Sequence, residues 1–488
     1  MSLQTALYAA RSALAVNSTQ TSTVSRNIAG INQSGYARRL VLVETNGTEV
    51  QSAGVDRATD LALRNAMLAA TSSSSADSAI NSALTSLQQS VGDPSSGTSP
   101  ASLISGLNSA LVQAAASPQN PASLGAAVDA AKSLAGALNS ASAQVQSTRT
   151  LADAAMSQSV STINSLLQKF SAANNSIVAG EKSGADVSDA LDRRDALLTS
   201  LAQQIGIKTV SGPGGDTAIY TDNGATLFQG GAAREVSMTP TTTLSPGVAG
   251  NAVYVDGAPI TGKGAGAPLQ GGALAGLSTI RDVTSQTYQT QLDEIARGLI
   301  NATSQSDQTG GGAAPRTGLF TWSGAPSTPS GPTNGVAAQI KVDPTVDPAS
   351  GGNVNLLRDG GIGAGASAYV SNPTGAASYN AGLQHLADSL GGAQSFDPSS
   401  AIAAQSSVAD FATNSVAWLE AARQAASTAS TQSSTFASQA TSALSNATGV
   451  NIDDQMSQML ALENSYQASA KMIGAVDTMY NSLFTSLG

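Results

Sequence analysis

Few side chains in this sequence could support catalysis, and the first to consider is its single histidine. His385 would have to be the base of any Ser/His/Asp triad, but it lies in the segment AGLQHLADSL, whose leucines recur at helical spacing. We interpret it as a surface or half-buried residue of a helix. A zinc peptidase of the His-Glu-x-x-His type needs two histidines, so the sequence excludes that activity.

Two other patterns that could do chemistry have simpler structural explanations. Asp453 and Asp454 could bind a metal, but they stand at the start of a helical repeat, where acids favour the positive end of the helix dipole. The pattern Gly-x-Gly-x-x-Ala over 262–267 loosely follows a dinucleotide fingerprint, but Pro268 and more glycines stand where a helix should begin. We therefore predict a loop there. We predict no catalytic, cofactor-binding or metal-binding residue, and no enzyme.

The composition excludes several classes of function. The 488-residue chain has a net charge of −10 and a pI near 4.6, which argues against nucleic-acid binding. Only 11% of its residues are charged and 4% aromatic, and it has no cysteine for a disulfide or a thiolate. No segment approaches the roughly 18 consecutive apolar residues of a membrane span, so no membrane insertion is expected. The N-terminus lacks the layout of a cleavable signal peptide.

The strongest structural pattern is at the two ends of the chain. Apolar residues recur there at alternating spacings of three and four, and this average of 3.5 keeps one stripe against a partner helix in a left-handed coiled coil. Asn17, Thr21, Gln455 and Ser469 interrupt the stripe. Residues 1–40 contain four arginines and no acid, whereas 450–488 contain four acids and one lysine. We expect the two stripes to pack on each other and on neighbouring subunits, with a modest contribution from the opposite charges.

The helical and β periodicities predict a mainly α fold with inserted β structure. Helices are expected over 3–31, 57–92, 101–116, 122–179 (with at most one break), 188–204, 273–305, 379–390, 399–446 and 452–487. Ser188 and Asp189 offer the N-cap oxygen of one of them, and Gly92-Asp93-Pro94 ends another. Strands are expected around the Asn46-Gly47 turn and over 205–210, 217–220, 226–228 and 253–255.

These elements predict three nested domains. Terminal coiled-coil helices (1–35 plus 450–488) form an inner domain. An elongated helical-bundle body follows (36–204 plus 271–449), with a loop and strand region near 308–378. A small outer β-domain (205–270) is inserted into that body.

Both ends also resemble one protein family. The segment SRNIAGINQSGYARR (25–39) looks like the Asn-Asn-Ile-Ala-Asn-x-x-Thr-x-Gly-Tyr signature of bacterial flagellar rod, hook and hook-associated proteins, although Arg26, Gly30 and Ser34 depart from it. The C-terminal segment resembles the closing helix of the same family, with its acidic start and Tyr-Gln-Ala-x-Ala-Lys centre. Two central blocks, DALDRRDALLTSLAQQIGIK and GALAGLSTIRDVTSQTYQTQLDEIARGLI, resemble the hook-associated protein 1 family.

The resemblance implies a structural adaptor between hook and filament, outside the cell and exported without a cleavable signal peptide. It implies a ring of about eleven copies, contacts with hook protein and hook-associated protein 3, and an export chaperone at the C-terminal helix. Another rod or hook subunit, or a secreted adhesin or protease with axial ends, are the alternatives. The stripes and the motif together predict an assembly interface of Leu3, Leu7, Leu14, Val24, Asn27, Ile28, Asn32, Gly35, Tyr36, Ile452, Met459, Leu462, Tyr466, Ile473, Val476, Tyr480, Leu483 and Leu487.

Two hypotheses about this interface follow. Because each stripe is interrupted by polar residues, the ends should be largely disordered in the free subunit and fold on incorporation. On that hypothesis, Ile473 and Val476 are exposed much of the time in a single chain. The turn at Gly35-Tyr36 should set the angle between the terminal helices and the body, with glycine allowing a positive φ.

Overall fold

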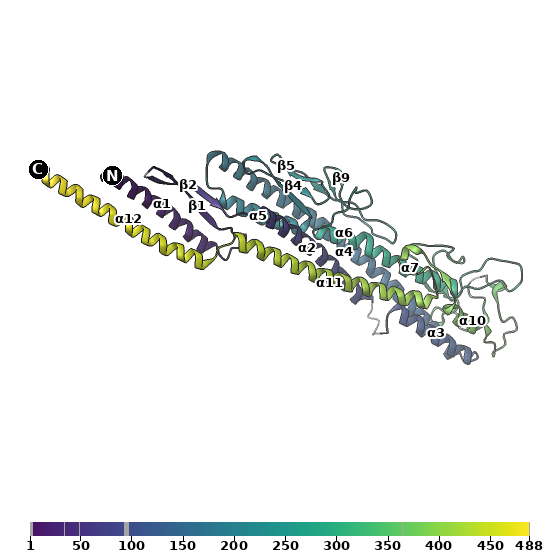
Figure 1. Ribbon diagram of the computed structural model, residues 1–488. Coiled ribbons are helices and arrows are strands. Elements are labelled where there is room, and N and C mark those ends of the chain that lie inside the picture. Colours follow the sequence, from purple (N-terminus) through teal and green to yellow (C-terminus); the bar gives the residue numbers. More distant parts are fainter. Residues whose placement is uncertain (1–2, 34, 48, 92–96, 364, 488) are drawn as a thin grey trace.

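The protein is a long, narrow molecule with both chain ends at the same extremity (Figure 1). The computed structural model describes residues 3–33, 35–47, 49–91, 97–363 and 365–487. The two terminal helices, α1 (Leu3–Gly30) and α12 (Ile452–Leu487), lie side by side at that extremity. The hairpin of β1 (Arg39–Asn46) and β2 (Glu49–Arg57) runs along α1. We call α1, the hairpin, the segment that joins them, and α12 the arm. The rest of the chain is the body.

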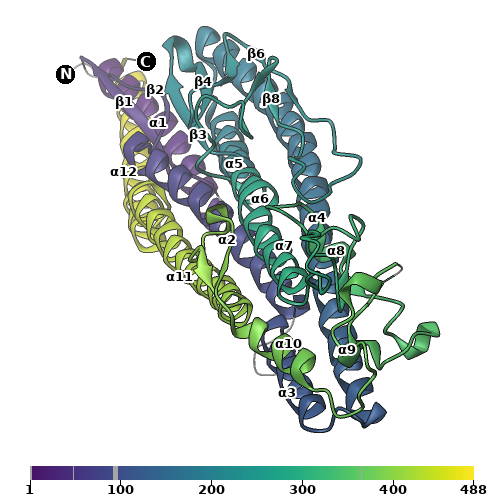
Figure 2. The ribbon, with the colours of Figure 1, turned by 90° about the vertical axis from the view of Figure 1, so that its right-hand side faces the viewer.

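Long helices that lie roughly side by side build the body (Figure 2). They are α2 (Leu61–Val91), α4 (Pro121–Ser183), α11 (Val408–Thr448), and the consecutive α6 (Ala273–Thr279) and α7 (Ser285–Ala302). The shorter α5 (Ser188–Gln204) packs on α4 and α2 near the arm, and α3 (Pro100–Ala116) packs on α4 at the far end.

Two small antiparallel sheets lie on the outside of the body near the arm. The four-stranded sheet has the order β3-β4-β5-β6 and the three-stranded sheet the order β7-β8-β9. Their strands are β3 (Ile207–Ser211), β4 (Thr217–Thr221), β5 (Thr226–Gln229), β6 (Ala232–Ala233), β7 (Val236–Ser237), β8 (Tyr254–Val255) and β9 (Ala258–Pro259). They follow directly from α5, as the change of sequence period predicts.

The far end of the body is covered by loops and short elements. Two two-stranded pairs occur there, β10 with β11 and β12 with β13. The elements are β10 (Phe320–Thr321), α8 (Val336–Gln339), β11 (Lys341–Val342), α9 (Leu356–Asp359), α10 (Ala381–Gly391), β12 (Gln394–Ser395) and β13 (Gln405–Ser406).

Two apolar clusters hold the body together, and α4 contributes to both. The far cluster packs residues such as Leu134 and Leu138 of α4 against α3, α7, α10 and α11. The cluster nearer the arm packs Phe170 of α4 edge-on against Phe228 of β5, with ring centroids 4.9 Å apart. Among the described residues, neither cluster includes a residue of the arm.

Most expected elements are present. Helix α4 is unbroken, in agreement with the expectation of at most one break; Asn120 caps its start, and it ends at Gly184, which has a φ of 69°. Three local expectations are wrong. The helix expected over 273–305 contains a π-helical turn (Ile280–Thr284), whose opened ladder lets the Arg281 carbonyl accept a bond from Arg149 Nε at 2.9 Å.

The other two differences concern helix starts. Helix α11 begins at Val408 rather than near 399, because a 3₁₀ turn (Pro398–Ser400) and β13 precede it and Ser407 caps it. At α5 the cap oxygen comes from neither Ser188 nor Asp189. Instead, Asp186 Oδ1 accepts the Ser188 N–H at 3.0 Å. The expected stop at Gly92-Asp93-Pro94 lies outside the described residues.

No helix within the described residues has both the length and the apolar character that crossing a bilayer requires.

Candidate assembly interface

The arm is built from the first and last helices of the chain, and polar groups hold them together as well as apolar ones. Val24 of α1 and Val476 of α12 are buried. Asn17 and Gln455, which interrupt the apolar stripes, are buried too, with 6% and 0% of their surface exposed. Asn17 Nδ2 donates to Ser465 Oγ at 2.9 Å. Polar pairs inside a helical seam fix its register at some cost in stability.

Asn27 connects the parts of the arm. Its Oδ1 accepts hydrogen bonds from the Arg39 backbone N–H at 2.9 Å and from the Tyr36 hydroxyl at 3.0 Å. Its Nδ2 donates to the Arg39 carbonyl at 2.9 Å and to Gln455 Oε1 at 2.8 Å. One buried amide therefore joins α1, the start of β1 and α12.

Two glycines near Asn27 have different roles in this chain. A Cβ placed on Gly30 would come within 2.7 Å of the Tyr36 ring, so glycine lets this ring lie against α1. Burial raises the pKa of Tyr36, which keeps its hydroxyl a hydrogen-bond donor at neutral pH. Gly35 has a φ of 80°, as expected for a sharp turn. A Cβ on Gly35 would have room, because the nearest atom, Ala196 Cβ, is 4.0 Å away.

Where the arm meets the body, carboxylates recur every third residue along α5 and the turn before it. We call the set Asp186, Asp189, Asp192 and Asp195 the carboxylate ladder. Arginines from four different elements reach it, namely Arg26 of α1, Arg39 of β1, Arg57 of β2 and Arg64 of α2.

The two arginines of the hairpin each pair with two successive aspartates of the carboxylate ladder. Arg39 pairs with Asp189 and, at 3.2 Å, with Asp192. Arg57 donates through Nε to Asp192 at 2.7 Å and through Nη2 to Asp195 at 2.7 Å. Both arginine side chains are buried, with 5% of their surface exposed. Removing one partner of such a buried pair strands the other charge and is strongly destabilising.

The outer rungs are shared with the helices. Arg64 Nη1 lies 3.0 Å from Asp195 Oδ1. Arg26 Nη1 lies 3.8 Å from Asp186 Oδ2 and is largely exposed. Burial alone would raise the pKa of Asp186, but hydrogen bonds from Ser188 and the nearby arginines outweigh it and hold that pKa low.

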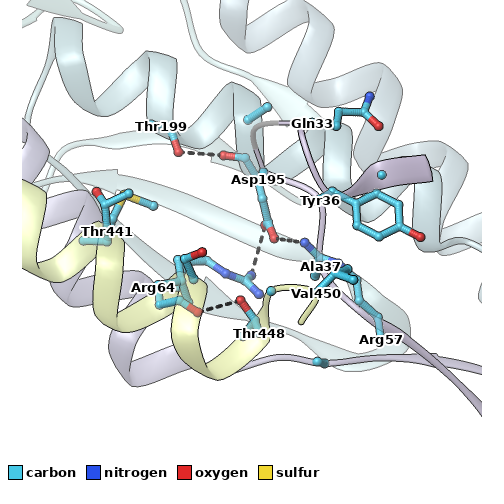
Figure 3. A pocket seen from close by; sticks show the side chains of 18 of the residues that line it. Gln33, Tyr36, Ala37, Arg57, Arg64, Asp195, Thr199, Thr441, Thr448 and Val450 are labelled. Carbon is cyan, nitrogen blue, oxygen red and sulfur yellow. Dashed lines mark hydrogen bonds and ion pairs between the residues drawn. The ribbon is translucent and has the colours of Figure 1, made fainter. Parts of the chain in front are cut away.

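A cavity of about 760 Å³ lies beside the ladder, between the end of α1, α2, α5 and the end of α11. Figure 3 shows Arg64 and Asp195 facing each other in it, with Tyr36 on one side and Thr441 and Thr448 on the other. The backbone N–H of Arg38 donates to the Thr448 carbonyl at 2.7 Å. The arm is therefore attached to the body by ion pairs around a hollow rather than by a shared apolar core.

The arm also exposes large apolar side chains. They lie on α12, on Tyr8 of α1 and on β1. Those of α12 that fall outside the predicted stripe are Met456, Leu460, Met472, Met479 and Phe484. Phe484 has 70% of its surface exposed. Apolar surface of this kind on a helix typically marks a protein–protein contact.

The predicted interface residues fall into three groups of exposure. The buried ones are Val24, Asn27 and Val476. The half-buried ones are Leu3, Leu7, Leu14, Ile28, Tyr36, Met459, Leu462, Ile473 and Tyr480. The exposed ones are Asn32, Gly35, Ile452, Tyr466 and Leu483. The side chain of Leu487 lies outside the described residues.

Val476 is buried in the folded arm, and how often the arm opens in the free subunit stays a prediction. Two other sequence-based expectations about this region need correction. Among the described residues, the terminal arginines Arg26 and Arg39 form ion pairs with the carboxylate ladder of the body and not with the acids of α12. Asn17 and Gln455 do not interrupt the seam but form hydrogen bonds across it, Asn17 with Ser465 and Gln455 with Asn27. The ladder itself was missed, although the spacing in DALDRRD signals it.

The residues considered for catalysis lie apart from one another, on two helices and in a turn region. His385 is exposed on α10, and Asp453 and Asp454 are exposed in the first turn of α12. The glycine pattern at 262–267 lies in a turn region after β9 and not at a helix start. Within the described part of the chain, no group of acidic or histidine side chains is arranged to hold a metal ion.

Comparison with known proteins identifies the class first. Residues 442–485, the end of α11 and most of α12, match the family described as flagellar basal body rod FlgEFG protein C-terminal. Residues 84–320 match the family described as flagellar hook-associated protein FlgK helical domain. The second match spans 237 of the 488 residues, just under half of the chain. The chain therefore carries a FlgK-type helical domain, and the two matches together define the class of structural flagellar proteins.

Three known proteins match the chain over part of their length. Flagellar hook-associated protein 1 of Salmonella typhimurium is 29% identical over 150 residues, 30% of this chain and 27% of the relative. The Escherichia coli protein of the same name is 28% identical over 158 residues, 32% of this chain and 28% of the relative. The matches thus span less than a third of the relatives' length. A structure of the flagellar hook junction protein FlgK from Burkholderia pseudomallei has a TM-score of 0.43 and 24% identity, covering 53% of this chain and 46% of that one.

Proposed function

We propose that this protein is a structural subunit of the bacterial flagellum that joins the hook to the filament. The observation that carries the proposal is the arm. The two chain ends form one paired unit at the extremity of an elongated body, and α12 exposes apolar residues along its length. This is the form expected of a subunit that inserts one end into a stack of other subunits. The family of the helical domain agrees with it.

The proposed partners come from the family resemblance of the sequence, and the apolar surface of the arm supports contacts of this kind. We propose a ring of about eleven copies, with hook protein on one side and hook-associated protein 3 on the other, outside the cell. The exposed residues of α12 are the proposed site of an export chaperone before assembly. The interface residues predicted from sequence, and the division into terminal, body and outer β-domains, belong to this proposal.

Locating the protein on isolated flagella tests the function. A peptide tag inserted after the exposed Gly312, in the loop region at the far end of the body, would be labelled with gold and viewed by electron microscopy. We expect label at the junction between hook and filament, with untagged cells as the control. Label along the hook or in the rod would instead establish another axial subunit, and label on the cell surface alone would contradict an axial role.

The arm's stability in the free subunit needs a separate measurement. We infer that the arm is completed only on assembly, because its seam contains buried polar groups and its outer face is apolar. Amide hydrogen exchange of the free full-length protein should show fast exchange in α1 and α12 and slow exchange in α4. Equal protection of α12 and α4 would show that a single chain already holds the arm rigidly.

A further inference from the structure

The sequence contains three Asn-Gly pairs, at 46–47, 223–224 and 334–335. In such a pair the glycine backbone nitrogen can attack the carbonyl carbon of the asparagine side chain, because glycine has no Cβ to block the approach. The attack requires that the asparagine amide can rotate and that the glycine N–H is not held in a hydrogen bond. The three pairs differ in both respects.

The fold restrains the pair at 223–224, which lies in the turn between β4 and β5. Asn223 Nδ2 donates a hydrogen bond to the Ala267 carbonyl at 2.8 Å. The N–H of Gly224 donates to the Thr221 carbonyl at 3.0 Å. The side-chain amide and the backbone nitrogen that would have to react are therefore both held.

The pair at 334–335 is restrained by the body. The N–H of the buried Gly335 donates to Asp293 Oδ2 of α7 at 2.8 Å. Asn334 packs against a neighbouring loop, because a Cβ on Gly247 would come within 2.1 Å of Asn334 Nδ2. The attacking nitrogen is occupied here as well.

The pair at 46–47, at the tip of the β1–β2 hairpin, has neither restraint. Asn46 and Gly47 are both exposed. Gly47 has a φ of 65°, and a Cβ built on it would meet no atom within 4 Å beyond its chain neighbours, so the space around the turn is open. Among the described residues, neither the Asn46 side-chain amide nor the Gly47 N–H has a hydrogen-bond partner.

We propose that Asn46 is a site of spontaneous deamidation, a covalent modification that needs only water. The Gly47 nitrogen gives up its proton and bonds to Cγ of Asn46, the Cγ–Nδ2 bond breaks, and ammonia leaves, so that a succinimide ring forms. Water then opens the ring. Its attack at the side-chain carbonyl yields aspartate, and its attack at the main-chain carbonyl yields isoaspartate, in which the main chain runs through the former side chain. This reaction is one reason why asparagine is thermolabile.

The product changes the charge of the hairpin tip. Asn46 is the cross-strand partner of Glu49, and Glu44 lies two residues before it in β1. A carboxylate at position 46 therefore stands opposite a like charge, an arrangement that destabilises a strand pair. Isoaspartate also adds one methylene to the main chain at the turn. The modification thus opposes the pairing of β1 with β2 at the tip.

Peptide mapping tests the proposal, because trypsin releases the three pairs in separate peptides, 40–57, 209–234 and 317–341, each with a single asparagine. The purified full-length protein would be incubated at mildly alkaline pH, either folded or unfolded in urea, and then digested, with a sample that was not incubated as the baseline. In urea all three peptides should gain the mass of deamidation and split into aspartate and isoaspartate forms. In the folded protein only peptide 40–57 should do so.

Asn46→Gln is the matched control, because it keeps an exposed amide but would have to close a larger, less favourable ring. The intact wild-type protein should gain a more acidic form on isoelectric focusing, and the variant should form much less of it. If peptide 40–57 stays unmodified in the folded protein, or if peptides 209–234 and 317–341 react as fast as it does, the proposal is wrong. The measurement uses the free protein, so its result does not depend on the proposed place in the flagellum.

Discussion

The arm and the body are stabilised by different kinds of contact. The body encloses two apolar clusters around the 63-residue helix α4, with side chains such as Phe170 and Leu134 almost fully buried. The arm has few buried apolar residues, a seam that contains amides, and large apolar side chains facing outward. The body can therefore hold its fold within one chain, whereas the arm reserves much of its apolar surface for contacts outside the chain.

The largest expected effect on stability is in the body. Phe170→Ala removes a buried ring that packs on Phe228 and should lower the free energy of unfolding by about 3–5 kcal/mol. The matched change in the arm, Phe484→Ala, should change it by less than about 0.5 kcal/mol, because that ring is exposed. Urea denaturation of both variants measures the contrast. Similar losses would mean that the arm and the body share one core.

A pH-dependent contribution to stability is also expected in the body. Burial raises the pKa of Asp293 to about 6, although backbone N–H groups of Gly335 and Ala337 bond its carboxylate. The folded pKa lies above the unfolded one, so this stability is present at low pH and is lost as pH rises through 6. Between pH 4 and pH 7, wild type should lose about 2–3 kcal/mol relative to Asp293→Asn. Urea denaturation of both at each pH measures the change, and a constant difference would contradict it.

A buried charge in the arm seam should separate stability from assembly. Val476→Asp places a carboxylate against α1, and the arm can release that strain by opening. The free energy of unfolding of the body, measured by thermal denaturation, should then change by less than about 1 kcal/mol. Cells should lose attached filaments and release filament protein into the medium. Asp477→Asn, on the exposed side of α12, is the control. A large drop in the melting transition would show that the arm and the body unfold together.

A local conformational cost is expected at the turn of the arm. Gly35→Val forces a β-branched residue to a φ of 80° and should cost about 1–2 kcal/mol locally. A Cβ there would meet only Ala196, at 4.0 Å, so the cost is conformational rather than steric. Motility on soft agar should fall, and Gly35→Asn, which tolerates this conformation, should retain more of it. Equal motility of both variants and wild type would remove the special role of the turn.

The fold was largely predictable from the sequence because it depends on periodicity. The helix at 188–204 has the expected bounds, and the hairpin turns at Asn46-Gly47 as expected, although its second strand continues to Arg57. The ends of elements were less predictable, because they depend on single polar contacts such as the Asp186 cap.

The interface was less predictable than the fold. The apolar stripes were visible in the sequence, but the carboxylate ladder unites arginines from four elements, and only the tertiary structure shows that they converge. The role of the polar residues in the stripe could not be predicted from the sequence either, because it depends on a distant partner. Whether Gln455 weakens the seam or pairs across it depends on Asn27, which lies 428 residues away along the chain.

The bonds of Asn27 also set an order of folding. Its contacts with Arg39 span 12 residues, so α1 and the hairpin can associate as soon as the first part of the chain is free. Its contact with Gln455 spans 428 residues and closes a loop that contains the whole body. Closing that loop has a large entropic cost until the body is compact. The docking of α12 is therefore the last step of folding, and its release is the first step of unfolding.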